Sequence, residues 1–251
     1  MDTVDFSPGG YRYLSGVFQY SSGVAAQPGH AIERVSFTAP QPLLEGFAVV
    51  ESWLRTRERP MTAFCACELR SPAPFTEQGF RDFNRQYVRT LERWGLYRDG
   101  VNPVARTNVC PVLDPPAVPC LLAFSYTVPA DGDVPGTFVI AGSGEAKDGG
   151  ASYRESTVRL GDVSIDGMRD KVRFVVDEMA RRLAALGFTW SDATSVQAYT
   201  QHDIGPLVRD ELFARGAGRR GLNWDYARPP IVDIEFEMDV RRPVVDRVLR
   251  T

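Results

Sequence analysis

The residues best suited to chemistry lie near the end of the chain, in residues 219–242. Residues 231–240 alternate in type, and four carboxylates share one parity: Asp233, Glu235, Glu237 and Asp239. A period of two predicts a strand with this acidic row on one face and an apolar row on the other. We expect Arg220 on the neighbouring strand, where its guanidinium and the Glu235 carboxylate together could hold a small acid and a water.

Other interpretations of these residues stay open. The acidic row is also typical of a half-buried strand with a solvated polar face, and Arg220 with Glu235 could be a structural ion pair between strands. Glu237 shares a face with Glu235, so a register shift of one pair would put Glu237 in its place. His202, beside Asp203 at an expected helix start, is either a capping or surface residue or a proton shuttle.

The pattern around the arginine occurs twice in the chain. In each copy an arginine is followed nine residues later by a proline and twelve residues later by a valine: Arg106, Pro115 and Val118, then Arg220, Pro229 and Val232. Leu121 of the first copy takes the position that Glu235 has in the second, so the first copy has the arginine without the acid. Such agreement in spacing predicts a tandem duplication, with units at 1–129 and 130–251 that meet at the turn-rich residues 130–136.

Both copies have the same order of expected elements, with strands alternating with helices. The clearest helix is expected over residues 165–186, where apolar residues form one stripe before Gly187. Another helix should follow Thr76, a suitable N-cap, and it carries an aromatic stripe typical of a core face. This order predicts an α+β protein of two units, each a mixed β-sheet with helices packed on one face.

Composition limits the classes of function. The 251 residues are 43% apolar and 24% charged, with a net charge of −3 and no basic block, so nucleic-acid binding is not expected. No apolar run is long enough to span a bilayer and no signal peptide is recognisable, so we expect a cytoplasmic protein without a membrane partner. The four cysteines are expected as buried free thiols, and with two histidines in the chain we expect no metal site and no cofactor.

Three stretches of the chain resemble the RidA/YjgF family of enamine and imine deaminases. They are TFVIAGSGEA at 137–146, the helix, glycine turn and strand at 161–200, and ARTNV at 105–109. The resemblance implies two tandem RidA/YjgF-like (chorismate-mutase-like) units, of which the first is more degenerate and the second carries the better-matched site. Two-unit members of this family include the chorismatases. The 2-aminomuconate and 2-amino-5-chloromuconate deaminases are the preferred comparison because of their length and layout.

The resemblance also implies roles for particular residues. Arg220 takes the position of the family's substrate-binding arginine, and Glu235 takes that of its acidic residue. For the family's aromatic residue the chain offers Trp224, Tyr20 and Tyr226. The other residues expected to contact the substrate are Arg106, Ser143, Gly144 and Glu237. The family's usual assembly further implies a homotrimer with its site at the interface between subunits.

These residues suit the hydrolysis of an enamine or imine, which needs little machinery. Protonation at carbon converts the enamine to an imine, water adds to the C=N carbon, and ammonia leaves. Arginine can hold a carboxylate through two N–H groups, so Arg220 should bind one carboxylate while Arg106 binds a second or supports an interface. Glu235 should orient water and move protons. The expected reaction is hydrolysis of a 2-aminomuconate-type enamine of an unsaturated dicarboxylate to the 2-oxo acid and ammonia.

Two further functions stay open at this point. The chain could be a chorismatase-like hydrolase of a cyclic diacid, or a non-catalytic module whose arginines hold a carboxylate metabolite. Ammonia release separates the deaminase from the chorismatase-like hydrolase, and binding without turnover would identify the module.

Overall fold

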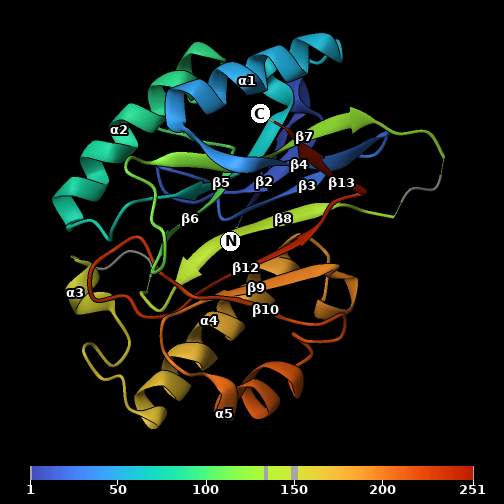
Figure 1. Cartoon of the computed structure of the whole chain (residues 1–251). Coiled ribbons are helices and arrows are strands. Elements are labelled where there is room, and N and C mark those ends of the chain that lie inside the picture. Colours follow the sequence, from blue (N-terminus) through green and yellow to red (C-terminus); the bar gives the residue numbers. More distant parts are fainter. Residues whose placement is uncertain (1, 133–134, 148–151, 251) are drawn as a thin grey trace.

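The protein forms four layers, with two β-sheets between two layers of helices (Figure 1). The structure is a computed structural model that describes residues 2–132, 135–147 and 152–250. One sheet has six strands and the other has seven. Helices α1 and α2 cover the outer face of the six-stranded sheet, and α4 covers that of the seven-stranded sheet (Figure 1).

The same four-stranded core occurs in both sheets. In the first unit it consists of β4 (His30–Pro42), β5 (Phe64–Arg70), β6 (Ala105–Pro111) and β7 (Cys120–Pro129). In the second unit it consists of β8 (Phe138–Gly144), β9 (Ser195–Tyr199), β10 (Asn223–Asp225) and β12 (Glu237–Arg242). The orders β4-β7-β5-β6 and β8-β12-β9-β10 are equivalent, and the β5–β6 and β9–β10 pairs are both parallel. The predicted α+β fold of two tandem units, each a mixed sheet with helices on one face, is confirmed.

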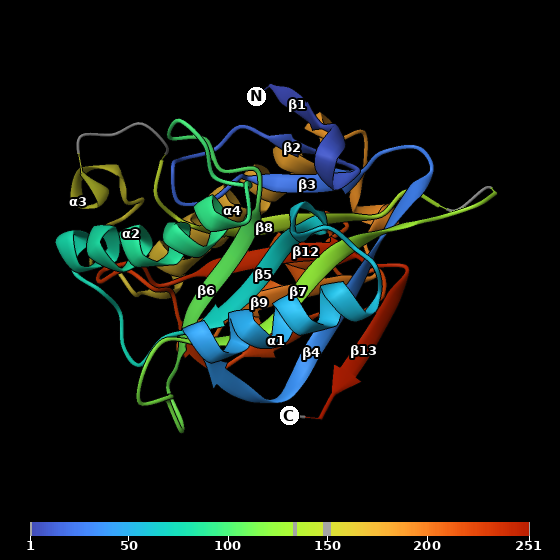
Figure 2. The same ribbon diagram turned by 90° about the horizontal axis from the view of Figure 1, so that it is seen from above.

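Each sheet also receives strands from the other half of the chain. The strands β1 (Thr3–Phe6), β2 (Tyr11–Leu14) and β3 (Gly23–Ala26) extend the seven-stranded sheet, where β3 pairs with β8. In return, β11 (Ala227–Arg228) pairs with β6, and β13 (Val245–Leu249) lies beside β4 in the six-stranded sheet (Figure 2). Neither sheet is therefore built from residues 1–129 or 130–251 alone.

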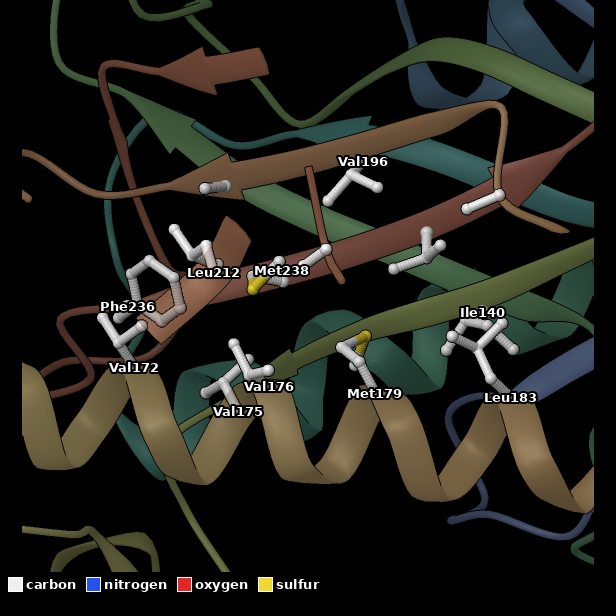
Figure 3. Packing of buried hydrophobic residues seen from close by; sticks show 14 of the residues in the cluster. Ile140, Val172, Val175, Val176, Met179, Leu183, Val196, Leu212, Phe236 and Met238 are labelled. Atoms are coloured by element: carbon white, nitrogen blue, oxygen red, sulfur yellow. The ribbon is translucent and has the colours of Figure 1, made fainter. Parts of the chain in front are cut away.

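The helices begin and pack largely where the sequence pattern indicates. They are α1 (Leu43–Thr56), α2 (Glu77–Arg93), α3 (Tyr153–Ser156), α4 (Ile165–Ala185) and α5 (Gly205–Leu207), with the π-helix η4 (Val208–Phe213) and the 3-10 turns η1 (Ser7–Gly9), η2 (Met61–Ala63) and η3 (Trp190–Asp192). The Thr76 side chain accepts the Gly79 N–H, which confirms it as the N-cap of α2. The apolar stripe of α4, with Val172 and Met179, packs on Met238 of β12 and on Phe236, which precedes that strand (Figure 3).

Between the two sheets lies a third cluster of buried residues. Its members are Tyr11, Tyr13, Val24, Ile32, Cys65, Ala66, Ala105, Val139 and Ala141. Small side chains dominate where β5, β6 and β8 approach each other, so the sheets can pack closely there. All four cysteines are buried free thiols, as expected.

The strand predicted over residues 231–240 is only partly correct. Strand β12 begins at Glu237, and residues 232–236 have no regular structure, with Asp233 at a φ of 70°. Ile231 is buried against α2 although it shares the parity of the carboxylates, whereas Val232 is exposed. Ile231 and Ile234 have opposite parity and yet pack in one cluster with Phe80 of α2, so burial over residues 231–236 does not follow the period of a strand.

The prediction that Arg220 and Glu235 lie on neighbouring strands is also wrong. Arg220 lies in an exposed turn before β10, and Glu235 lies before β12, so neither belongs to a strand. Strand β10 takes the place in the second unit that β6 has in the first, because each runs parallel to the strand beside it. Arg106 lies within β6, whereas Arg220 precedes β10, so the two arginines are not structurally equivalent.

Candidate active site

A cavity of about 340 Å³ lies where β6 begins and β8 ends, between the two units. Both units, the segment between β2 and β3, and helices α2 and α4 contribute to its wall. The lining residues that matter for chemistry are Tyr20, Phe80, Arg106, Gly142, Ser143, Gly144, Arg182, Ile234 and Glu237. Its volume lies in the range of small-molecule sites.

Arg106 supplies a buried positive charge to this cavity. It extends from β6, only 3% of its surface is exposed, and one Nη1–H donates to the amide oxygen of Asn84 on α2. The rings of Tyr20 and Tyr87 have their centroids 5.0 and 4.8 Å from its guanidinium carbon. Within the described residues Arg106 forms no salt bridge. A buried cation without an anionic partner is costly, so the arrangement favours an anionic ligand.

Glu237 supplies a carboxyl group to the same cavity. It is the first residue of β12 and pairs with Gly144 of β8. The β8–β12 pairing has a bulge between Met238 and Val240, and Gly142 of β8 lies opposite this bulge and close to the Glu237 carboxyl group. A Cβ on Gly142 would lie 2.1 Å from the Glu237 Oε1 atom, so a glycine is required for the carboxyl group to lie where it does. Bulges of this kind often re-aim side chains beside active sites.

Burial raises the pKa of Glu237 well above its ordinary value, and the negative charge of Asp239 adds to this effect. The positive charge of Arg106 acts in the opposite direction but does not outweigh burial. Glu237 therefore keeps its proton to a higher pH than an exposed glutamate does. A carboxyl group whose pKa is raised in this way is better suited to act as a general acid.

Arg182 is a cavity residue that the sequence analysis missed. Its Nε donates to Glu178 at 2.7 Å, while its Nη1 and Nη2 donate to the Ala141 carbonyl oxygen and the Ser143 hydroxyl, both at 3.2 Å. A signal was present, because residue 182 follows Met179 by three positions and so falls on the apolar stripe of α4. A charged residue on a buried helix face indicates a specific polar partner inside the protein.

Part of the remaining wall of the cavity is apolar. Phe80 of α2 packs with Ile231 and Ile234 in a small cluster, which Ala146 and Tyr153 extend. A cavity with a cationic and acidic end and an apolar wall suits a small, partly unsaturated carboxylate.

The structure brings together four of the seven predicted site residues. Arg106, Ser143, Gly144 and Glu237 line the cavity. The other three lie outside it: Arg220, Glu235 and Trp224. Of the three aromatic candidates, Tyr20 lines the cavity, whereas Trp224 and Tyr226 are exposed, with Trp224 donating its ring N–H to the Thr200 carbonyl oxygen.

Glu235 has a different partner from the one expected. Its Oε2 lies 2.7 Å from the Nε2 of His202, and its backbone carbonyl oxygen accepts the Thr200 hydroxyl. The side chain thus points away from the cavity, although Glu235 is only two residues from Glu237. The sequence left open that Glu237 takes the place of Glu235. The structure does place Glu237 at the cavity, but because β12 begins only at Glu237 and not because of a shift in strand register.

The fold and the site define a class of protein. The described residues contain no group of three or more His, Cys, Asp or Glu side chains able to hold a metal ion. None of the described helices has both the length and the apolar character needed to cross a membrane. The cavity combines a buried arginine that forms no salt bridge within the described residues with a carboxyl group of raised pKa. This combination is typical of acid–base chemistry on a small carboxylate.

Comparison with known proteins identifies the family. The family model described as 2-aminomuconate deaminase CnbZ matches residues 3–247, so the chain belongs to this family. A 2-amino-5-chloromuconate deaminase of Comamonas testosteroni is 56% identical over 249 residues, which cover 99% of each chain. The predicted enzyme class, a deaminase that hydrolyses a C–N bond, is confirmed, as is the predicted 2-aminomuconate type.

Solved structures agree with the fold. A chorismatase crystal structure superposes with a TM-score of 0.53 at 14% identity and covers 90% of this chain and 78% of its own. At this identity the likeness concerns the fold alone. The alternative of a chorismatase-like activity therefore gains nothing from it.

Proposed function

We propose that the chain hydrolyses 2-aminomuconate or a close analogue in the cavity between β6 and β8. The observation that carries this proposal is a buried guanidinium, that of Arg106, without an anionic partner among the described residues, in one cavity with the protonatable Glu237. A dicarboxylate enamine supplies both the missing anion and a carbon atom that needs a proton.

Glu237 begins the reaction as a general acid. It protonates a carbon of the enamine, and the resulting imine carbon becomes the electrophile. The Glu237 carboxylate left behind then accepts a proton from the water that adds to that carbon. The C–N bond breaks, ammonia leaves, and a carbonyl group remains. The sum is one enamine and one water giving one 2-oxo acid and one ammonia, without oxidation or reduction.

Arg106 holds the carboxylate next to the reacting carbon. Its guanidinium has five N–H groups, and the structure shows one donated to Asn84, so a two-pronged contact with a carboxylate remains available. Aromatic rings around the guanidinium exclude water and strengthen this contact.

The second carboxylate lies toward the other cations of the cavity. Arg182 donates three of its five N–H groups within the protein, which leaves two for a ligand. Arg81 and Lys147 line the cavity as well. Ser143 and Gly144, at the end of β8, contact the polar groups of the substrate between the two carboxylates.

The test compares residues inside and outside the cavity. Ammonia release and loss of ultraviolet absorbance are measured with freshly generated 2-aminomuconate. Arg106→Ala and Glu237→Gln should each lower kcat/KM by about 100-fold or more. Arg220→Ala and Glu235→Gln, which change residues outside the cavity, should stay within about threefold of the wild type. The opposite ranking would place the reaction at Glu235 and overturn the proposal.

The assembly and location of the protein belong to this proposal too. The resemblance to RidA-like proteins supports a homotrimer, whose mass by light scattering should be three times the 27.9 kDa of the chain. Arg106, Arg182 and Glu237 come from one chain, so trimer formation is not needed to bring them together. A cytoplasmic location is proposed as well, and cell fractionation tests it.

A further inference from the structure

A fully buried ion pair lies directly behind the cavity wall. Lys171 Nζ and Glu145 Oε1 are 3.0 Å apart, and neither side chain has any exposed surface. Glu145 follows the end of β8, and Lys171 lies on α4. The chain has only two lysines among its 29 basic residues, so a buried lysine is an unusual choice here.

The pair holds the residues that lead into Glu237. The Glu145 carboxylate accepts the backbone N–H of Glu235 at 2.7 Å and that of Phe236 at 3.0 Å. Lys171 Nζ also donates to the Val158 carbonyl oxygen at 2.9 Å. The carboxylate thus connects β8, α4 and the two residues immediately before Glu237.

The hydrogen bonds to the Glu145 carboxylate hold residues 235 and 236 where strand pairing does not. Residues 232–236 have no regular structure, and β12 begins only at Glu237. The two N–H groups held by Glu145 are the last before the strand, so they determine where the strand begins and which way Glu237 faces. On the other side of the pair, the Val158 N–H donates to the Glu145 carbonyl oxygen at 2.8 Å and keeps the adjoining wall in place.

We propose that the Glu145–Lys171 pair is a positioning device for Glu237, which keeps its carboxyl group in the cavity and sets its electrostatic surroundings. This inference rests on the proposed function, because it concerns the group that moves the proton. In this pair, the positive charge of Lys171 stabilises the anionic form of Glu145. Burial raises the pKa of Glu145, and the charge of Lys171 opposes that effect.

The charges that face Glu237 come from four elements. Asp239 belongs to the same strand, Arg106 comes from β6, Glu145 follows β8, and Arg182 comes from α4. The negative charges of Asp239 and Glu145 raise the pKa of Glu237, and the two arginines lower it. Loss of the charge of Glu145 alone, with Lys171 left as a cation, should therefore lower the pKa of Glu237.

The test uses three variants in the full chain. Glu145→Gln keeps the shape of the side chain but removes its charge. Glu145→Gln/Lys171→Met removes both charges and leaves no unpaired ion, which keeps the test valid if the single variant does not fold. Arg173→Gln is the matched control. Arg173 lies on α4 as Lys171 does, and its ion pair with Glu211 of η4 does not line the cavity. The readouts are circular dichroism, kcat and KM for ammonia release, pH–rate profiles, and inhibition by muconate.

The expected result separates positioning from general damage. Both Glu145 variants should lower kcat by about tenfold or more. The inhibition constant of muconate, which needs Arg106 but no proton transfer, should change by less than about threefold. The alkaline limb of the pH–rate profile should move to lower pH in Glu145→Gln and return toward the wild-type position in the double variant. Arg173→Gln should match the wild type in every readout.

Two results would overturn the inference. One is a folded Glu145→Gln protein with wild-type kcat and pH profile. The other is an equal loss of kcat and muconate binding in the double variant, which would indicate collapse of the cavity. Glu237→Gln, measured in parallel, separates this inference from the proposed function. If Glu237→Gln stays active, the role proposed for Glu237 is wrong. If Glu237→Gln is inactive and Glu145→Gln is unaffected, only the positioning role of the Glu145–Lys171 pair is wrong.

Discussion

At the scale of single residues, the space around Glu237 is set by two glycines. A Cβ on Gly142 would meet the Glu237 carboxyl group, whereas a Cβ on Gly144 would lie 2.5 Å from a methyl group of Ile234. The two positions are neighbours on one strand, yet one touches the acid and the other touches the apolar wall. Substituting alanine at one position or the other therefore disturbs either the Glu237 carboxyl group or the apolar wall.

We expect Gly142→Ala and Gly144→Ala to fail in different ways. Gly142→Ala should displace the carboxyl group and lower kcat by about 10- to 100-fold, because small errors in the position of a catalytic group are costly. Gly144→Ala should act mainly through KM, because it disturbs the apolar wall. Steady-state ammonia release with both variants checks this, and equal effects on kcat would argue against a Gly142–Glu237 contact.

The raised pKa of Glu237 also predicts how stability depends on pH. Between the ordinary glutamate pKa and the raised folded value, the folded chain binds more protons than the unfolded chain, so this group makes stability fall as pH rises. Glu237→Gln stays neutral and should lack this decline. Urea unfolding at pH 5.5 and pH 8.5 should show the variant gaining on the wild type at the higher pH. A constant difference between the two proteins would count against the shift.

At the scale of elements, a buried network of charges joins strands of the two sheets. Glu68 of β5 contacts Arg34 of β4 and Arg241 of β12, and Arg241 also donates to Asp239. Burial alone would raise the pKa of Glu68, but the charges of Arg241 and Arg34 outweigh it and hold the pKa well below its ordinary value. This network of charges therefore connects the two units. The small residues of the cluster between the two sheets connect the same units by packing.

Removal of the Glu68 charge should destabilise the protein strongly. Glu68→Gln removes one carboxylate partner from each of two largely buried guanidinium groups, which keep Asp246 and Asp239. The expected loss at pH 7 is about 3 kcal/mol. Because the folded pKa is lowered, the stabilisation is present above the ordinary glutamate pKa and is lost as pH falls below it. Urea unfolding at pH 7 and pH 3.5 should thus show a smaller difference between the two proteins in acid.

An exposed ion pair provides the control for this network. Asp82→Asn breaks the pair with Arg85 on α2, where both side chains are more than half exposed. Such pairs contribute little, so the expected change is within about 0.5 kcal/mol. A loss for Glu68→Gln no larger than that of the control would show that the buried network adds no stability.

At the scale of the whole molecule, the exchange of strands makes the two units depend on each other. Residues 1–129 contain β3 but lack its partner β8, and residues 130–251 contain β13 but lack its partner β4. The boundary near residue 130 thus divides the repeat in sequence without dividing the sheets in space.

We therefore expect neither half to fold alone. Residues 1–129 and 130–251, produced separately, should show no cooperative urea transition, because each sheet lacks edge strands and the cavity lacks one wall. Co-expression of the halves should restore a cooperative transition and ammonia release. A cooperative transition for either isolated half would show that a single unit is stable without the exchanged strands.

Much of this protein could be predicted from the amino-acid sequence alone. The helices over 77–93 and 165–185 follow from local periodicity and a capping residue, which neighbours in the chain encode. The tandem repeat followed from spacing, and the resemblance of three stretches to a known family led to the deaminase class. The same resemblance pointed to Arg106, Ser143 and Gly144, which the structure places at one cavity. In each of these cases the deciding interactions lie within one element or repeat unit.

Only the tertiary structure decided which glutamate faces the cavity and which segments form its wall. Glu235 and Glu237 share a parity, so periodicity could not distinguish them, and the choice depends on the Glu145 carboxylate some 90 residues away in the chain. Arg182, Tyr20 and the exchanged strands depend in the same way on contacts between distant segments. The sequence therefore determined the elements and the family, whereas the site exists only where two units pack, because that packing excludes water and brings unlike charges together.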